Sequence, residues 1–293
     1  MNLGPFVMAL KAPPEPVVDF LFHQYAPVPV SLVPGLSDFH VAIRRPRSMR
    51  GFWLRDQLVA DPGFALPSLP LPVSMAPLVM EMAMNAAVAL KCWRLGILHA
   101  GVVEKNGRAV VISAPSGGGK STLTLALMTQ GWRLLSDEFA LFRLPDGLLL
   151  GYPRPVSLKN ESVALAHAWL GESALSNTYH DTPKGSIAYR RVRPEDVTGA
   201  GQAVTAAAIV FPQYEQGSDL AAVPVPRSDA FLRLVASSTN YHLLGRTGFE
   251  ALKRLTGFAR AYELSFSDAL AAARHIEEDL TATVPVAMDE THG

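Results

Sequence analysis

Residues 114–121 read Ala-Pro-Ser-Gly-Gly-Gly-Lys-Ser and lie between an apolar run typical of a strand and an apolar run typical of a helix. Three successive glycines let several backbone N–H groups converge on an anion, because no side chains block the approach. The N-terminus of the following helix, expected over 121–130, adds unpaired N–H groups and the positive end of its dipole. This order of strand, glycine-rich turn and helix predicts a loop that binds the phosphates of a nucleotide, of the type called Walker A.

Each position of this P-loop has an expected role. Lys120 would reach the β- and γ-phosphates of ATP, and the Ser121 hydroxyl would be a ligand of Mg²⁺. The usual motif begins with glycine, whereas this chain has Ala114. The alternative is a plain glycine-rich turn that happens to end in Lys-Ser. The residues predicted to bind the nucleotide are Pro115, Ser116, Gly117, Gly118, Gly119, Lys120, Ser121 and Thr122.

The composition is that of an ordinary globular protein. The 293 residues are 49% hydrophobic, and 26 Lys and Arg balance 26 Asp and Glu, so no basic excess indicates nucleic acid. The single cysteine, Cys92, excludes an internal disulfide and fits a reducing compartment. The apolar run 73–90 is interrupted by Pro77, Glu81 and Asn85, which favours a buried helix over a membrane span. We therefore expect a cytoplasmic protein with no membrane or nucleic-acid partner.

The chain divides into three parts by composition. Residues 1–72 are rich in proline, which makes long helices unfavourable and predicts a small β-rich N-terminal lobe. A nucleotide-binding kinase domain is expected over 73–280, beginning with a helix at about 75–93. Residues 281–293 show no periodicity and are expected to form a disordered tail.

The P-loop strand is expected to arrive through a hairpin. Residues 96–104 and 108–114 have strand character, and Asn106-Gly107 between them is typical of a two-residue turn. In the commonest nucleotide-binding architecture the loop strand is instead reached from a helix and lies in a parallel sheet. The hairpin therefore predicts a mixed sheet.

Two carboxylates follow the next short strand, expected over 132–135. Asp137 is predicted to be the general base that takes the proton of an acceptor hydroxyl, and Glu138 to help hold Mg²⁺. Because neighbouring residues of a regular strand point to opposite faces, only one of the pair would then face the P-loop. A turn-capping role is the alternative for Asp137.

These segments resemble a known family. His99 in a strand, the loop 114–121 and Ser136-Asp137-Glu138 are similar in order to the kinase domain of bacterial HPr kinase/phosphorylase. Residues 134–141, 157–162 and 180–182 are closer to its divergent branch, HprK-related kinase A, and the resemblance extends to about residue 275.

The resemblance implies an α/β fold of the HPr-kinase/PEP-carboxykinase type with a mixed sheet, plus the β-rich lobe. It also implies ATP- and Mg²⁺-dependent phosphorylation of a hydroxyl, serine in the parent family, and an assembly that could be a homo-oligomer. Glu138 stands where the family has a second Asp, and Ala100 separates His99 from Gly101. These differences leave phosphorolysis and HPr as the acceptor open.

Further polar residues are candidate contacts to the acceptor or to phosphate. His99 is a candidate catalytic contact, with a satisfied core histidine as the alternative. The polar loop 180–185 could close over the acceptor as a lid, although a surface turn explains it nearly as well. Arg190, Arg191 and Arg193 could supply a cation or form a solvated face. The candidate acceptor or phosphate contacts are Lys159, Asn160, His180, Asp181 and Lys184.

The sequence thus predicts a serine kinase-like phosphotransferase acting on a peptide or protein. Two alternatives remain open at this stage: a kinase of a small molecule or sugar hydroxyl, and a non-catalytic nucleotide-binding regulatory module.

Overall fold

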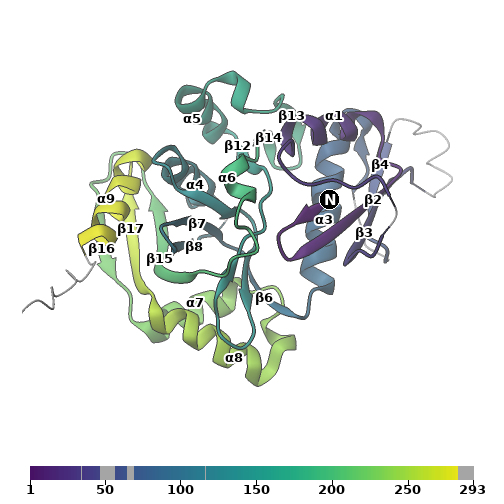
Figure 1. Ribbon diagram of the computed structural model, residues 1–293. Coiled ribbons are helices and arrows are strands. Elements are labelled where there is room, and N and C mark those ends of the chain that lie inside the picture. The colour runs from purple at the N-terminus through teal and green to yellow at the C-terminus, as the bar shows by residue number, and fades with distance from the viewer. Residues whose placement is uncertain (34, 47–56, 65–68, 116, 283–293) are drawn as a thin grey trace, which may run out of the picture.

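The computed structural model describes residues 1–33, 35–46, 57–64, 69–115 and 117–282. Figure 1 shows an N-terminal lobe beside a larger body built around a twisted sheet. The predicted disordered tail falls almost entirely on 283–293, outside the described residues, so that prediction is untested. The fold is mixed α/β, as expected.

The largest sheet has six strands in the order β16-β17-β15-β8-β7-β9. β8 (Arg108–Ile112) pairs antiparallel with β7 (Gly101–Lys105) and parallel with β15 (Thr205–Tyr214). Asn106 and Gly107 have φ values of 55° and 76°, both in the left-handed region. A two-residue hairpin turn of type I′ requires positive φ at both of its central residues. The predicted hairpin and the mixed sheet are therefore confirmed. The other strands of this sheet are β9 (Arg133–Ser136), β16 (Ala221–Pro224) and β17 (Arg260–Phe266).

Helices cover both faces of this sheet because its strands are apolar on both sides. Val110 and Ile112 face α4 (Lys120–Thr129) and α9 (Ala269–Ala282), whereas Ala109 and Val111 face the opposite helix layer. This alternation follows from the two-residue period of a strand. The opposite layer consists of α7 (Arg227–Ser237) and α8 (Tyr241–Phe258).

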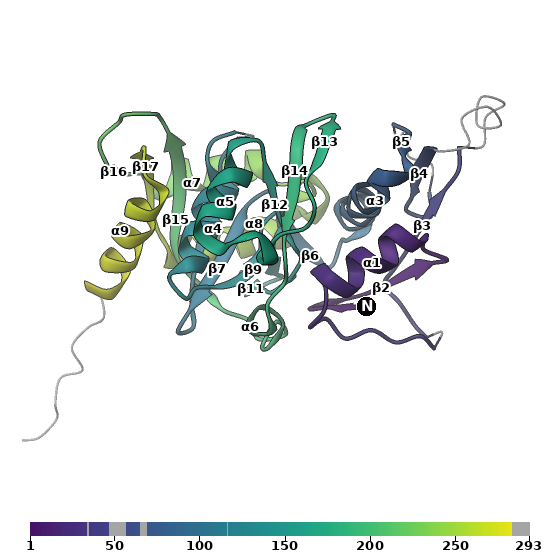
Figure 2. The same cartoon turned by 90° about the horizontal axis from the view of Figure 1, so that it is seen from above.

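Two three-stranded sheets adjoin the large one. The order β11-β10-β6 joins β6 (Leu95–Leu98), β10 (Ala140–Arg143) and β11 (Leu149–Leu150). The order β12-β14-β13 joins β12 (Val156–Lys159), β13 (Tyr179–Thr182) and β14 (Gly185–Arg190). In Figure 2 this second small sheet stands between the large sheet and the N-terminal lobe. Short helices α5 (Glu161–Leu170) and α6 (Pro194–Val197) flank it.

In its described residues the N-terminal lobe contains a five-stranded sheet, in agreement with the predicted β-rich lobe. No long helix was expected in 1–72, and the ten-residue α1 (Glu15–Gln24), which was not predicted from the sequence, follows Pro14. Pro16 lies in its first turn, where the missing N–H has no helical partner to lose. The five strands are β1 (Asn2–Leu3), β2 (Phe6–Lys11), β3 (Phe39–Arg44), β4 (Gln57–Asp61) and β5 (Leu71–Pro72).

Helix α3 (Ala76–Lys91) packs against this lobe's sheet through β3 and β4. Its buried residues share one core cluster with Phe6, Met8 and Val41 of the lobe. The sequence placed this helix at the start of the kinase domain, but its packing joins it to the N-terminal lobe. The domain boundaries themselves stay a prediction.

One segment of the described chain, Val73–Lys91, is long and apolar enough by composition to cross a membrane. It comprises a short 3₁₀ turn, η1 (Val73–Met75), followed by α3, and 56% of the apolar window is buried inside the protein. A core helix has the same composition, so this segment is weak evidence for a span.

One strand differs from expectation. The strand expected over 96–104 is two strands, interrupted at His99 and Ala100, where His99 N–H donates to the Ser237 carbonyl (2.8 Å). Helix α8 has a break at Gly245, where φ and ψ are not helical.

Asn240 joins the end of α3 to the large body. Its Nδ2 donates to the carbonyls of Cys92 and Leu95 (both 2.9 Å), and its Oδ1 accepts from Ile97 N–H (3.0 Å). The residue is fully buried, so every bond lost exposes a polar group with no access to water.

We expect Asn240→Ala to lower the free energy of unfolding by about 2–4 kcal/mol, because three buried backbone groups lose their partner. Urea denaturation measures this change. The matched control is Asn177→Ala at an exposed position, which should change stability by less than about 0.5 kcal/mol. Equal stability of the two variants would contradict the role given to Asn240.

Candidate active site

The P-loop connects β8 to the first turn of α4. Gly117 and Gly119 have φ values of 87° and 85°, a region that side chains other than glycine rarely adopt. A Cβ on Gly118 would lie 2.9 Å from the Cβ of Ala114, so this position is closed to larger residues as well. Ser116 lies outside the described residues, and its predicted role stays a prediction.

The N-terminus of α4 is open toward the loop. No side chain of the described residues caps the first turn of this ten-residue helix, which begins at Lys120 after Gly119. Its unpaired N–H groups can therefore bind an anion. The geometry fits the predicted phosphate site, although phosphate binding itself stays a prediction.

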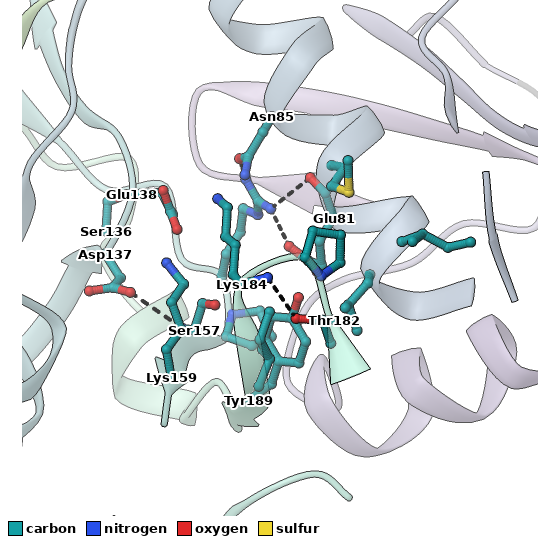
Figure 3. Close-up of a pocket in the computed structure, with 17 residues that line it drawn as sticks. Glu81, Asn85, Ser136, Asp137, Glu138, Ser157, Lys159, Thr182, Lys184 and Tyr189 are labelled. Atoms are coloured by element: carbon teal, nitrogen blue, oxygen red, sulfur yellow. Dashed lines mark hydrogen bonds and ion pairs between the residues drawn. The ribbon is translucent and has the colours of Figure 1, made fainter. Parts of the chain in front are cut away.

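Asp137 lies beside the P-loop. The Ser121 hydroxyl donates to its Oδ2 (3.1 Å), and the backbone N–H of Ser157 donates to the same oxygen (3.3 Å; Figure 3). Its Oδ1 is buried and has no hydrogen-bond partner among the described residues. The carboxylate is thus held by one oxygen and leaves the other for a ligand or a proton.

Both carboxylates approach Lys120. β9 ends at Ser136, so Asp137 and Glu138 lie beyond the strand, and their side chains need not point to opposite faces of the sheet. The expectation that only one of the two faces the P-loop applied to a regular strand and therefore does not hold. Asp137 is 3% exposed, and Lys120 acts electrostatically on both side chains.

The two neighbours have opposite proton affinities. Burial and the negative charge of Glu138 raise the pKa of Asp137 to about 6, although Lys120 and the Ser121 hydrogen bond partly offset them. Burial also acts to raise the pKa of Glu138, but the His99 hydrogen bond and the charges of Lys120 and Lys159 outweigh it and bring that pKa to about 2. Glu138 is therefore ionised at neutral pH, while Asp137 titrates close to it.

His99 contacts Glu138 rather than the hydrophobic core. Its Nε2 lies 3.4 Å from Glu138 Oε2, and its side chain is 46% exposed. This exposure argues against the alternative of a satisfied core histidine. Its direct part in catalysis stays a prediction.

Ser121 and Glu138 are the predicted ligands of Mg²⁺, and this stays a prediction. In this structure the Ser121 hydroxyl donates a hydrogen bond to Asp137. The described residues contain no group of three His, Cys, Asp or Glu side chains that could hold a metal alone. Mg²⁺ commonly takes one or two protein oxygens and completes its shell with phosphates and water. The two predicted oxygens, from Ser121 and Glu138, are within that number.

A cavity of about 140 Å³ begins at Asp137 and Glu138 and extends to α3. In Figure 3, Lys159 and Lys184 extend in the same direction into the space between the two carboxylates and this helix. The other lining residues are Leu71, Leu78, Glu81, Met82, Asn85, Ser136, Arg154, Pro155, Ser157, Thr182, Pro183, Ile187 and Tyr189.

Of the five predicted acceptor or phosphate contacts, Lys159 and Lys184 line this cavity. Asn160 instead accepts a hydrogen bond from Ser186 N–H through Oδ1 (3.1 Å), and His180 Nδ1 lies 3.0 Å from the Ser186 hydroxyl. Asp181 has a φ of 56°. Asn160 and His180 therefore bond to Ser186 of β14, and Asp181 lies where the register of β13 and β14 is irregular.

The lid expected at 180–185 is a β-hairpin. β13 ends at Thr182 and β14 begins at Gly185, and the Thr182 hydroxyl donates to the Gly185 carbonyl (2.6 Å). Residues 183 and 184 form the tight turn between the two strands, which agrees with the surface turn left open as the alternative to a lid. Lys184 lies in this turn, so the paired strands on either side of it fix the position of its backbone.

The arginines proposed to supply a cation have structural partners. Arg190 pairs with the buried carboxylate of Asp196 (3.1 Å), and Arg193 pairs with the same residue (3.0 Å). Asp196 Oδ1 also accepts the N–H of Leu134 (2.9 Å). These groups anchor α6 beneath β9 and lie outside the cavity.

The sequence interpretation missed a buried polar group at the floor of the cavity. Arg154 donates to both Glu81 and Asn85 of α3, and the Tyr25 hydroxyl donates to Glu81 Oε1 (2.5 Å). One signal was present: Glu81 and Asn85 are four residues apart in an otherwise apolar helix, and so share one face.

Comparisons with known proteins give a distant similarity to a solved structure. No family model matches the chain, and no curated protein matches its sequence. Among solved structures, the HPr(Ser) kinase/phosphatase from Coxiella burnetii matches with 13% identity and a TM-score of 0.28, covering 64% of this chain and 97% of that one. The similarity is distant, and the assignments below rest on the residues of this chain.

Without nucleotide or Mg²⁺, we expect Asp137→Asn to be more stable than the wild type at pH 8, by up to about 3 kcal/mol. Asp137 has an ordinary pKa of 3.8 when unfolded and about 6 when folded. Asp137 therefore makes its full contribution to the free energy of unfolding below pH 3.8, and this contribution is lost as the pH rises through 6. The asparagine does not titrate, so the variant does not lose it.

Urea unfolding at pH 4, 6 and 8 measures the difference, which should be small at pH 4. The exposed Asp219→Asn is the matched control. A difference between Asp137→Asn and the wild type that does not change with pH would show that the carboxylate is not held as described.

Proposed function

We propose that this protein is a cytoplasmic ATP- and Mg²⁺-dependent kinase that transfers the γ-phosphate to a hydroxyl, that of a serine in a peptide or protein. One observation carries the proposal. The buried Asp137 carboxylate touches Ser121 of the glycine-rich loop on one side and opens into a cavity on the other. A base that faces a nucleotide and an acceptor together has this position.

The loop and its flanking side chains would hold the nucleotide. The N–H groups of 117–121 and the Lys120 ammonium offer the positive charge that the β- and γ-phosphates need. Bound Mg²⁺ would neutralise the negative charge that develops on the phosphate oxygens. Ser121 and Glu138 would contribute its protein oxygens, which leaves Oδ1 of Asp137 for the acceptor.

Asp137 would receive the proton of the acceptor hydroxyl at Oδ1. Its Oδ2 is fixed by Ser121 and by Ser157 N–H, so the second oxygen is oriented without being saturated. A pKa of about 6 leaves most of the carboxylate ionised at neutral pH and able to accept a proton. Lys159, on the wall of the cavity, adds a cation beside the reacting groups.

A second candidate is a kinase of a small-molecule hydroxyl. The size of the cavity favours it, because about 140 Å³ holds a molecule of few atoms. The third candidate is the non-catalytic regulatory module. The cavity beside the buried Asp137 carboxylate does not favour it.

We expect Lys120→Ala and Asp137→Asn each to reduce phosphoryl transfer by about 100-fold or more, because one loses the phosphate contact and the other the base. Asp137→Asn should still bind ATP. The measurement is incubation with Mg²⁺ and γ-labelled ATP in a lysate of the source organism, with the label then separated by size. Lys253→Ala and Asp219→Asn, at exposed positions, are the matched controls.

Label in a peptide or protein that disappears with Asp137→Asn would support the proposed function. Mutant-sensitive label in the small-molecule fraction would support the second candidate. Retained transfer in Asp137→Asn would refute the base assignment, and ATP binding without any labelled product would favour the regulatory module.

A further inference from the structure

We propose that the cavity between α3 and the β12–β14 sheet is the acceptor site, and that it takes a small hydroxyl-bearing group that carries an anionic group within a few bonds of the hydroxyl. This inference rests on the proposed function. It adds the location and the chemical class of the acceptor.

The position of the cavity separates it from the nucleotide. Asp137 and Glu138 line it, whereas none of the described loop residues, 113–115 and 117–121, does so. A nucleotide on the P-loop and a group in the cavity would therefore meet at Asp137 from opposite sides. In-line transfer requires the attacking and leaving oxygens to lie on opposite sides of the phosphorus.

The size of the cavity limits what can enter. A volume of about 140 Å³ is close to that of an apolar cavity that holds one benzene molecule, or roughly five waters. This corresponds to about six to eight non-hydrogen atoms. A single residue inserted from a peptide fits, and so does a three-carbon hydroxy acid, whereas a folded protein surface does not.

The cavity is lined by three cationic side chains, Arg154, Lys159 and Lys184, and by three acidic ones, Glu81, Asp137 and Glu138. Arg154 is neutralised by Glu81 at the floor, with both side chains less than 9% exposed. Among the described residues, Lys159 and Lys184 form no ion pair within 4.0 Å. The wall around them also includes the apolar side chains of Leu78 and Ile187.

Lys159 already interacts electrostatically with Asp137 and Glu138, whereas Lys184 is an exposed residue with no counter-ion within 4.0 Å among the described residues. An anionic group on an acceptor in the cavity could form a charge-assisted hydrogen bond with a lysine, which an uncharged acceptor offers more weakly. Bound γ-phosphate can satisfy Lys159, which lies near Glu138 in Figure 3, but Lys184 extends farther toward Asn85 of α3. Lys184 is therefore the residue we assign to the anionic group of the acceptor.

The first test uses four acceptors in two matched pairs, with Mg²⁺ and labelled ATP. The pairs are glycerate and glycerol, and the blocked peptides acetyl-Ala-Asp-Ser-Ala-amide and acetyl-Ala-Asn-Ser-Ala-amide. We expect phosphorylation of the anionic member of a pair with a KM at least about tenfold below that of its neutral partner. Preference within the first pair identifies a free small molecule, and preference within the second identifies a peptide.

The second test assigns that preference to Lys184. Lys184→Met should raise the KM of the anionic acceptor about tenfold, leave the KM of ATP within about twofold, and abolish the preference. Lys253→Met is the control. An equal rise in the KM of ATP would place Lys184 on the nucleotide and overturn its assignment.

The third test fills the cavity. Met82→Trp adds volume at a half-exposed position of the wall, and should abolish transfer while leaving ATP binding intact. Leu90→Trp, exposed on the same helix and away from the cavity, is the control.

Transfer at the wild-type rate by Met82→Trp, no preference for the anionic acceptors, or no phosphorylation of any of the four would each overturn the inference. If the lysate experiment shows mutant-sensitive label, the proposed function survives these results. If the lysate shows no label either, the proposed function fails, and this inference fails with it.

Discussion

The ion pair between Arg154 and Glu81 is the interaction on which the arrangement of the site depends. Both side chains are buried, and neither could stay charged without the other, because removal of one partner would leave an unneutralised charge inside the protein. Tyr25 and Asn85 add hydrogen bonds to the pair. The group ties α1 and α3 of the N-terminal lobe to the segment that enters β12.

That segment leads directly to the site. Ser157, three residues after Arg154, donates its N–H to Asp137, so the lobe contact and the carboxylate are joined by one short stretch of backbone. The same contact fixes the distance between α3 and the β12–β14 sheet, and hence the width of the cavity. The N-terminal lobe therefore forms one wall of the site instead of an appended unit.

Asp137 and Glu138 show how neighbouring carboxylates acquire different chemistry. Glu138 has His99 and two lysines around it, and these outweigh its burial. Asp137 is more deeply buried and also feels the charge of Glu138, so its proton affinity rises. Two adjacent acidic residues thus divide into one that stays charged and one that can exchange a proton near neutral pH.

Much of the large sheet could be predicted from short-range patterns. Asn106-Gly107 determined a hairpin because both residues readily adopt positive φ, and the mixed sheet followed from that turn. The helix after Gly119 was predicted to within one residue. Less local elements were harder to predict. The segment at Lys184 was left open between a lid and a surface turn, and α1 was missed, because Pro and Gly interrupt one element in some contexts and begin or end it in others.

The sequence by itself determined the glycine-rich loop, its strand and helix, and the acidic pair that follows, because backbone conformation and local apolar period depend on near neighbours in the chain. Only the tertiary structure decided which charges meet. Glu81 and Arg154 are 73 residues apart, and Lys184, in the turn between β13 and β14, lines the same cavity as Asp137. Whether a buried charge finds its partner depends on long-range packing, and no local pattern records it. The cavity, its unpaired lysines and the different proton affinities of Asp137 and Glu138 are therefore properties of the folded chain.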